Sequence, residues 1–159
     1  IAKRLVEPIN YAITILNPYV QNQLSREDND INIKDLIKNF LIPLIFVLTI
    51  SYLSFGKNFI EFLSGKEFIE AYYPMLILLI GYCTYLATFW IRQLLLFNDL
   101  LQHHVVSKVI STVSFLVFSY FFVNQYGASG LAIALSISMI LQKVYEFYIF
   151  NKFTKQTNK

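Results

Sequence analysis

Long uncharged stretches divide this chain into segments. Residues 109–142 contain no Asp, Glu, Lys or Arg over 34 positions. A continuous helix of that length would measure about 50 Å, whereas the hydrocarbon core of a bilayer is about 30 Å thick. The run therefore predicts two membrane-spanning helices joined by a turn. We expect the turn within residues 124–130, which hold the run's only glycines, Gly127 and Gly130.

Two further uncharged stretches, 39–56 and 71–91, are each long enough for one span. The pattern predicts helices at about 1–24, 36–56, 70–97, 105–123 and 131–150, followed by a cytoplasmic tail at 151–159. Lys143 and Glu146, near the end of the last helix, are expected to reach the lipid headgroups. The predicted fold is all-α: a polytopic transmembrane helical bundle of about five spans, forming a single domain over 1–159.

The first of these segments is the least apolar. Only 11 of the 20 residues from Leu5 to Leu24 are apolar, and Pro8 and Pro18 interrupt the segment. A membrane helix tolerates polar side chains and prolines where they face other helices or a wet cavity. The alternative is an amphipathic helix on the membrane surface.

Two connecting segments carry most of the remaining charges. Residues 25–38 hold both acidic and basic side chains and predict an aqueous loop. Between 59 and 73, apolar residues recur at helical spacing around Lys57, Glu61, Lys66 and Glu67. This spacing predicts a short helix that lies in the membrane interface.

Composition and charge support a membrane protein and suggest its orientation. The mean hydropathy is +0.52 and only 14% of residues are charged, against about 25% in average soluble proteins. If five spans alternate, nine Lys and Arg residues lie on one side and four on the other. The positive-inside rule then places the 25–38 loop, the 98–104 loop and the C-terminus in the cytoplasm, and the glycine turn outside.

The ends and the cysteine content add two expectations. The chain opens on Ile1 in what looks like the middle of a helix, without the basic and apolar regions of a signal peptide. We therefore expect a C-terminal fragment of a larger protein. Cys83 is the single cysteine and lies in an apolar run, which excludes a disulfide framework and a cysteine-based metal site within this sequence.

Catalytic and cofactor-binding patterns are sparse in this sequence. His103 and His104 are adjacent, so on a helix they would point about 100° apart and would not share a metal ion as an i, i+4 pair does. We expect them to be solvated loop residues, with Asp99 close enough to pair with either. The sequence contains no phosphate-binding glycine loop and no nucleophile elbow, and its basic residues lack the interleaved aromatics of a nucleic-acid groove. We expect no enzymatic activity, no cofactor, no metal and no nucleic-acid partner.

Four charged residues at membrane depth are the candidate substrate-binding residues: Lys3, Arg4, Glu7 and Arg92. Lys3 and Glu7 are four residues apart and could neutralise each other. Arg4 and Arg92 could each extend to the headgroups, on the outer and the cytoplasmic side respectively. Alternatively, their guanidinium groups offer bidentate hydrogen bonds to phosphate oxygens.

Three sequence landmarks resemble a known family. They are the late proline entering a charged loop at 17–28, the spacing of Gly65, Phe68 and Ala71 before residues 75–78, and the paired glycines opening a small-residue helix at 126–134. Their order resembles the polysaccharide-transporter branch of the multidrug, oligosaccharidyl-lipid and polysaccharide flippase superfamily, which includes the O-antigen flippases. The resemblance covers nearly the whole chain.

The resemblance implies a function. Proteins of this family have about a dozen or more helices in two pseudo-symmetric halves, so this chain would be the end of the second half. It would carry a lipid-linked oligosaccharide from the cytoplasmic to the outer leaflet of a bacterial inner membrane, with Lys3 and Arg4 as ligands of the polyprenyl pyrophosphate. The expected partners are this substrate, membrane lipids and a coupling ion. A multidrug exporter of the same superfamily, or a membrane-embedded sugar or acyl transferase using Asp99 with a histidine, remain the alternatives.

Overall fold

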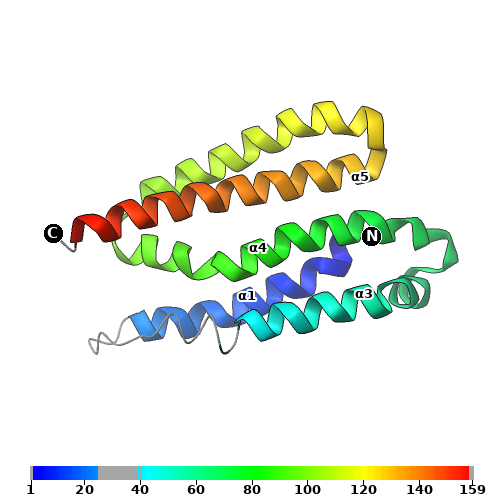
Figure 1. Cartoon of the computed structure of the whole chain (residues 1–159), viewed down its shortest axis with the longest axis horizontal. Helices are drawn as coiled ribbons and strands as arrows, with labels where there is room; N and C mark the ends of the chain where they lie inside the picture. Colours follow the sequence, from blue (N-terminus) through cyan, green and yellow to red (C-terminus); the bar gives the residue numbers. More distant parts are fainter. Residues whose placement is uncertain (1, 25–38, 40, 158–159) are drawn as a thin grey trace.

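The computed structural model describes residues 2–24, 39 and 41–157, and this part of the chain is helical without any strand (Figure 1). Its elements are α1 (Ala2–Leu24), α3 (Ile42–Ser64), the 3₁₀ helix η2 (Lys66–Ala71), α4 (Tyr72–Phe97) and α5 (Leu101–Thr157). Among the described residues, three helical segments are long and apolar enough to cross a membrane: Ile42–Ser64, Lys66–Phe97 and Leu101–Phe153. The all-α class and its membrane-type helices are thereby confirmed, whereas α1 is not among the three.

Helix α5 is a hairpin, as the uncharged run predicts. Gly127 has non-helical backbone angles, φ 52° and ψ −125°, and the helix folds back there (Figure 1). Few residues other than glycine adopt such a conformation. Gly130 lies where the two arms touch, because a Cβ at this position would overlap the carbonyl oxygen of Phe122. We call residues 101–126 the first arm and 128–157 the second arm.

The helices form layers around α4. Helix α1 runs parallel to α4, while α3 runs antiparallel to it (Figure 1). The second arm packs on α4, where the Ser136 hydroxyl donates to the Ile77 carbonyl over 2.8 Å. A Cβ at Gly81 would come within 3.0 Å of the Ser136 backbone, so glycine allows this close helix crossing. The first arm then lies on the second.

The core follows the apolar spacing of α1 and α4. Val6, Ile9 and Ile13 are buried at helical spacing on one face of α1. They belong to the same cluster as a buried set on α4 that includes Leu86 and Phe89. By contrast, many large apolar side chains of α3 and the first arm are exposed, which is typical of surfaces that face lipid or other helices.

Several predicted boundaries are wrong. Helix α3 continues through Ser64 instead of ending at 56, and the separate interfacial helix is absent from the described chain: residues 59–64 belong to α3 and 66–71 form η2. Helix α3 ends at Gly65, which has φ 93°. Gly56, where the helix was predicted to end, is helical and buried against Tyr72 and Met75.

The other boundary errors lie in α5. It begins at Leu101 instead of 105, and the predicted turn at 124–130 contracts to the single non-helical residue Gly127. The predicted tail at 151–159 is helical through Thr157. The predicted loop at 25–38, like the start of the second predicted helix at 36–38, lies outside the described residues.

Candidate functional site

A buried polar cluster joins the two arms of α5 near their open end. Glu146 is 0% exposed and accepts four hydrogen bonds. Its Oε1 accepts from Gln142 Nε2 at 2.9 Å and His104 Nδ1 at 3.2 Å. Ser107 Oγ lies 2.8 Å from the same oxygen and 2.7 Å from the His104 carbonyl oxygen, so its one hydrogen is shared between these two acceptors. Its Oε2 accepts from Lys143 Nζ at 2.7 Å. We call these five residues the Glu146 cluster.

The burial of charged side chains in this cluster is notable because removing a charge from water costs free energy. A buried ion pair is stable only if further hydrogen bonds use the remaining lone pairs of the anion and the remaining hydrogens of the cation. Glu146 meets this condition through donors from both arms, since His104 and Ser107 belong to the first arm and Gln142 and Lys143 to the second. The carboxylate therefore fixes the register of the hairpin.

Helix α4 presents an aromatic ring to the same cluster. The Lys143 ammonium lies 4.2 Å from the centre of the Tyr85 ring, and the Lys108 ammonium lies 5.7 Å from it. Both distances fall in the range of cation–π attraction. Lys108 also donates to Gln142 Oε1 over a long 3.4 Å contact. Tyr85 thus connects α4 with cations from both arms.

Arg92 lies beside the Glu146 cluster, on α4 and about two helical turns after Tyr85. Its charge acts on His104, Lys108 and Lys143. Its Nε is buried, yet has no hydrogen-bond partner among the described residues. Three basic side chains, Arg92, Lys108 and Lys143, therefore lie in this region with one carboxylate, Glu146, so basic groups outnumber acidic ones there.

The structure corrects the prediction for both histidines. They are not solvated loop residues, because α5 begins at Leu101 and includes them. His104 is 8% exposed and contacts Glu146, whereas the half-buried His103 contacts the Tyr145 hydroxyl over 3.2 Å. Asp99 is exposed in the turn between α4 and α5, with φ 57°. The histidines thus contact residues of the second arm.

Lys143 and Glu146 are also placed differently from the prediction. They are 2% and 0% exposed and pair with each other instead of extending to the headgroups. Ser107, His104 and Glu146 do not form a nucleophilic triad, because Ser107 contacts the carboxylate directly instead of the imidazole. This arrangement stabilises charge and shows no activated nucleophile.

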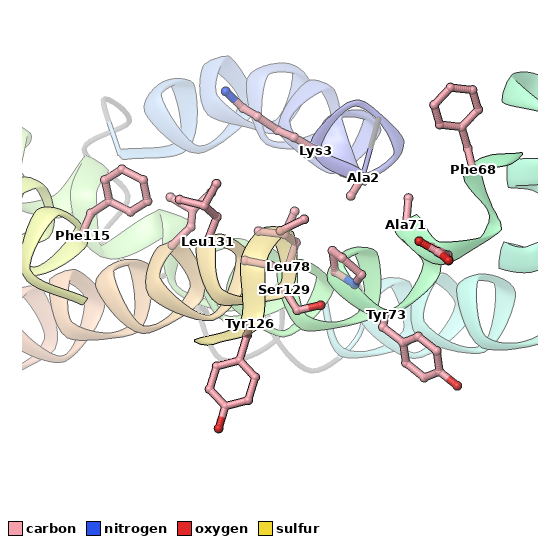
Figure 2. Close-up of a pocket in the computed structure, with 15 residues that line it drawn as sticks. Ala2, Lys3, Phe68, Ala71, Tyr73, Leu78, Phe115, Tyr126, Ser129 and Leu131 are labelled. Carbon is pink, nitrogen blue, oxygen red and sulfur yellow. The ribbon is translucent and has the colours of Figure 1, made fainter. Parts of the chain in front are cut away.

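A second candidate site is a pocket of about 800 Å³ at the other end of the bundle. It opens between α1, the start of α4 and the turn of α5 (Figure 2). Its lining is mainly apolar and includes Leu78, Phe115 and Leu131. Lys3 and Glu70 supply its charged groups. The phenol groups of Tyr73 and Tyr126 point away from the gap between α1 and the turn (Figure 2).

The four predicted site residues do not meet at one place. Lys3 lines the pocket, Arg4 is exposed, and Glu7 is half-buried on α1. The described part of the chain shows no ion pair between Lys3 and Glu7. Arg92 lies at the opposite end of α1, because its neighbour Gln93 donates to Asn17 Oδ1 at 2.8 Å. Lys3 and Asn17 are separated by about 20 Å of helix.

Sequence reasoning missed most of the Glu146 cluster, although a signal for it exists. Folding the uncharged run at Gly127 places residues about 20 positions before the turn beside residues about 19 positions after it. His104, Ser107 and Lys108 then face Gln142, Lys143 and Glu146. Each set has the i, i+3 or i, i+4 spacing of one helix face.

Comparison with known proteins adds no assignment: no family model, curated protein or solved structure matches this chain. Inferences about function therefore rest on the geometry of the two sites.

Proposed function

We propose that this chain is part of a membrane transporter that moves a lipid-linked, anionic oligosaccharide across the bilayer. The observation that carries the proposal is the pair of basic side chains Arg92 and Lys108 beside the Glu146 cluster, together with the partnerless Nε of Arg92 among the described residues. A buried guanidinium nitrogen has a strong requirement for an acceptor, and phosphate oxygens match it in charge and geometry. A diphosphate would offset the excess charge of Arg92 and Lys108.

The same geometry favours an anionic substrate over a cationic drug. A drug exporter for cations needs a carboxylate that is available to the ligand. Both oxygens of Glu146 already accept hydrogen bonds from protein donors. The transferase alternative needs Asp99 beside a histidine, whereas His104 contacts Glu146 and His103 contacts Tyr145.

The proposal includes five membrane crossings, with α1, α3 and α4 crossing once and α5 crossing twice. The alternating directions of α1, α3, α4 and the two arms support it (Figure 1). With the excess of Lys and Arg inside, the Glu146 cluster lies at the cytoplasmic end and the pocket at the outer end. The substrate headgroup would then bind at the Glu146 cluster before transfer outward.

Single-cysteine labelling tests this topology. In the full-length protein with Cys83→Ser and any cysteines outside this segment replaced, Gln125→Cys is expected to react with a membrane-impermeant maleimide on intact cells. Asp99→Cys and Lys152→Cys are expected to react only after permeabilisation. The cysteine-free protein is the control. Labelling of Gln125→Cys and Lys152→Cys from the same side would contradict the paired crossing of α5.

Substitution of Arg92 tests the transport proposal. A charge-assisted hydrogen bond contributes about 1.5–3 kcal/mol, so Arg92→Gln should lower transport at least about tenfold. The assay uses full-length protein in proteoliposomes and a fluorescent prenyl diphosphate-linked sugar. A quencher added outside reaches only the outer leaflet, so the rate at which protected fluorescence changes measures transport between leaflets. Lys152→Gln, which removes an exposed cation of α5, is the matched control. Transport by Arg92→Gln at the wild-type rate would overturn the assignment of Arg92.

A further inference from the structure

The Glu146 cluster contains one imidazole, the side-chain type that can gain or lose a proton in the physiological pH range. His104 is the residue whose ordinary pKa lies near 6.5, and its ring has two distinct nitrogens. Because an ionised carboxylate only accepts hydrogen bonds, the Nδ1 of His104 carries the hydrogen in its contact with Glu146 Oε1. In the neutral ring, Nε2 is then the nitrogen that can take up a proton.

Opposing charges act on this ring. Burial away from water is the largest influence and opposes an imidazolium, as do the positive charges of Arg92 and Lys108, whereas the negative charge of Glu146 stabilises it. The groups packed around the ring come from every element at this end of the bundle. They are Arg92 and Tyr85 of α4, His103, Ser107 and Lys108 of the first arm, and Gln142, Lys143, Tyr145 and Glu146 of the second arm.

We propose that His104, held by Glu146, is a proton-binding site that takes up one proton when an anionic substrate binds at Arg92 and Lys108. This inference rests on the proposed function and adds a proton to its substrate-binding step. A proton from water bonds to Nε2 and the ring becomes imidazolium, while Nδ1–H stays on Glu146 Oε1. The substrate phosphate compensates the added charge, so the two binding events favour each other reciprocally.

The cluster suits a proton better than a metal cation. Hard cations such as Mg²⁺ and Ca²⁺ need several oxygen ligands. The oxygens of Glu146 face N–H and O–H donors from four residues, and Lys143 adds a positive charge. Within the described ranges, no group of three or more His, Cys, Asp or Glu side chains could hold a metal ion. The turn residues Asn98 and Asp99, six and five positions before His104, are exposed.

Proton uptake on binding provides the test. Purified full-length protein in weakly buffered detergent solution is mixed with farnesyl diphosphate that carries N-acetylglucosamine on its terminal phosphate. The phosphates of this probe do not titrate near neutrality, so they release no protons themselves. Between about pH 6 and 8, the range where histidine titrates, a pH-indicator dye should report uptake approaching one proton per bound probe. His104→Gln should bind the probe with little uptake, whereas the neighbouring His103→Gln should take up protons as the wild type does.

The outcomes separate the two proposals. If the wild type does not bind the probe, the proposed function fails. If it binds without proton uptake, or if His104→Gln takes up as many protons, the proposed function stands and the proton site is overturned. The pH dependence of wild-type affinity gives the same information without a variant: affinity should weaken up to tenfold per pH unit on the alkaline side. Equal affinity across the range would overturn the proton site, as would affinity that depends on Na⁺ instead of pH.

Discussion

Glu146→Gln is expected to destabilise the protein by about 3–5 kcal/mol, because the substitution leaves the Lys143 ammonium buried without its counterion. Lys143 is 2% exposed, so it cannot regain hydration without moving the second arm away from α4. The neutral amide also offers one acceptor oxygen where the carboxylate accepts from four donors. Chemical unfolding of the full-length protein in detergent, followed by far-ultraviolet circular dichroism, measures the loss.

An exposed ion pair provides the matched control for Glu146→Gln. The Glu61 and Lys66 side chains are 44% and 82% exposed and lie 3.5 Å apart. Surface pairs contribute about 0–1 kcal/mol, so Glu61→Gln should be nearly neutral. Adding Lys143→Met to Glu146→Gln removes the unpaired charge and should recover part of the lost stability. Equal small losses in Glu146→Gln and Glu61→Gln would show that the buried pair does not hold the arms together.

The all-α class and the hairpin of α5 were predictable because their signals are local. The length of the uncharged run requires a fold-back, and glycine is the residue that permits the backbone angles of Gly127. The helix ends were less predictable. Gly56 and Gly65 are both glycines in similar surroundings along the sequence, but only Gly65 has a positive φ. The packing of Tyr72 and Met75 against Gly56, which sequence periodicity does not reveal, keeps that part of α3 helical.

The Glu146 cluster was less predictable because the partners of Glu146 come from both arms of the hairpin. Taken singly, Lys143 and Glu146 look like side chains at a helix end that extend to the headgroups. Their burial depends on His104 and Ser107, which lie about 40 positions earlier in the sequence. Arg92, in contrast, is a candidate from its apolar surroundings alone. What the sequence could not supply is the neighbour of Arg92 from another helix, Lys108 of α5.

Substitutions of Gly130 are expected to disrupt the hairpin in proportion to side-chain size. The first added carbon would overlap the backbone carbonyl of Phe122, which cannot rotate away as a flexible side chain does. Overpacking typically costs about 1–3 kcal/mol, so Gly130→Ala should lose at least that much and Gly130→Val more. Because the arms must separate, the contacts of Glu146 with His104 and Ser107 should weaken as well.

Gly127 distinguishes this steric explanation from backbone strain. No atom lies within 4 Å of the position a Cβ would occupy there, but φ is 52°. Gly127→Ala and Gly127→Ser should therefore lose similar amounts, about 1–3 kcal/mol, whatever the size of the side chain. Ala128→Ser, at an exposed position of the same turn, is the control and should be neutral. Unfolding free energies of the full-length variants in detergent measure all five substitutions. If Gly130→Ala and Gly130→Val were no worse than Ala128→Ser, the arms would not be in the close contact that brings His104 to Glu146.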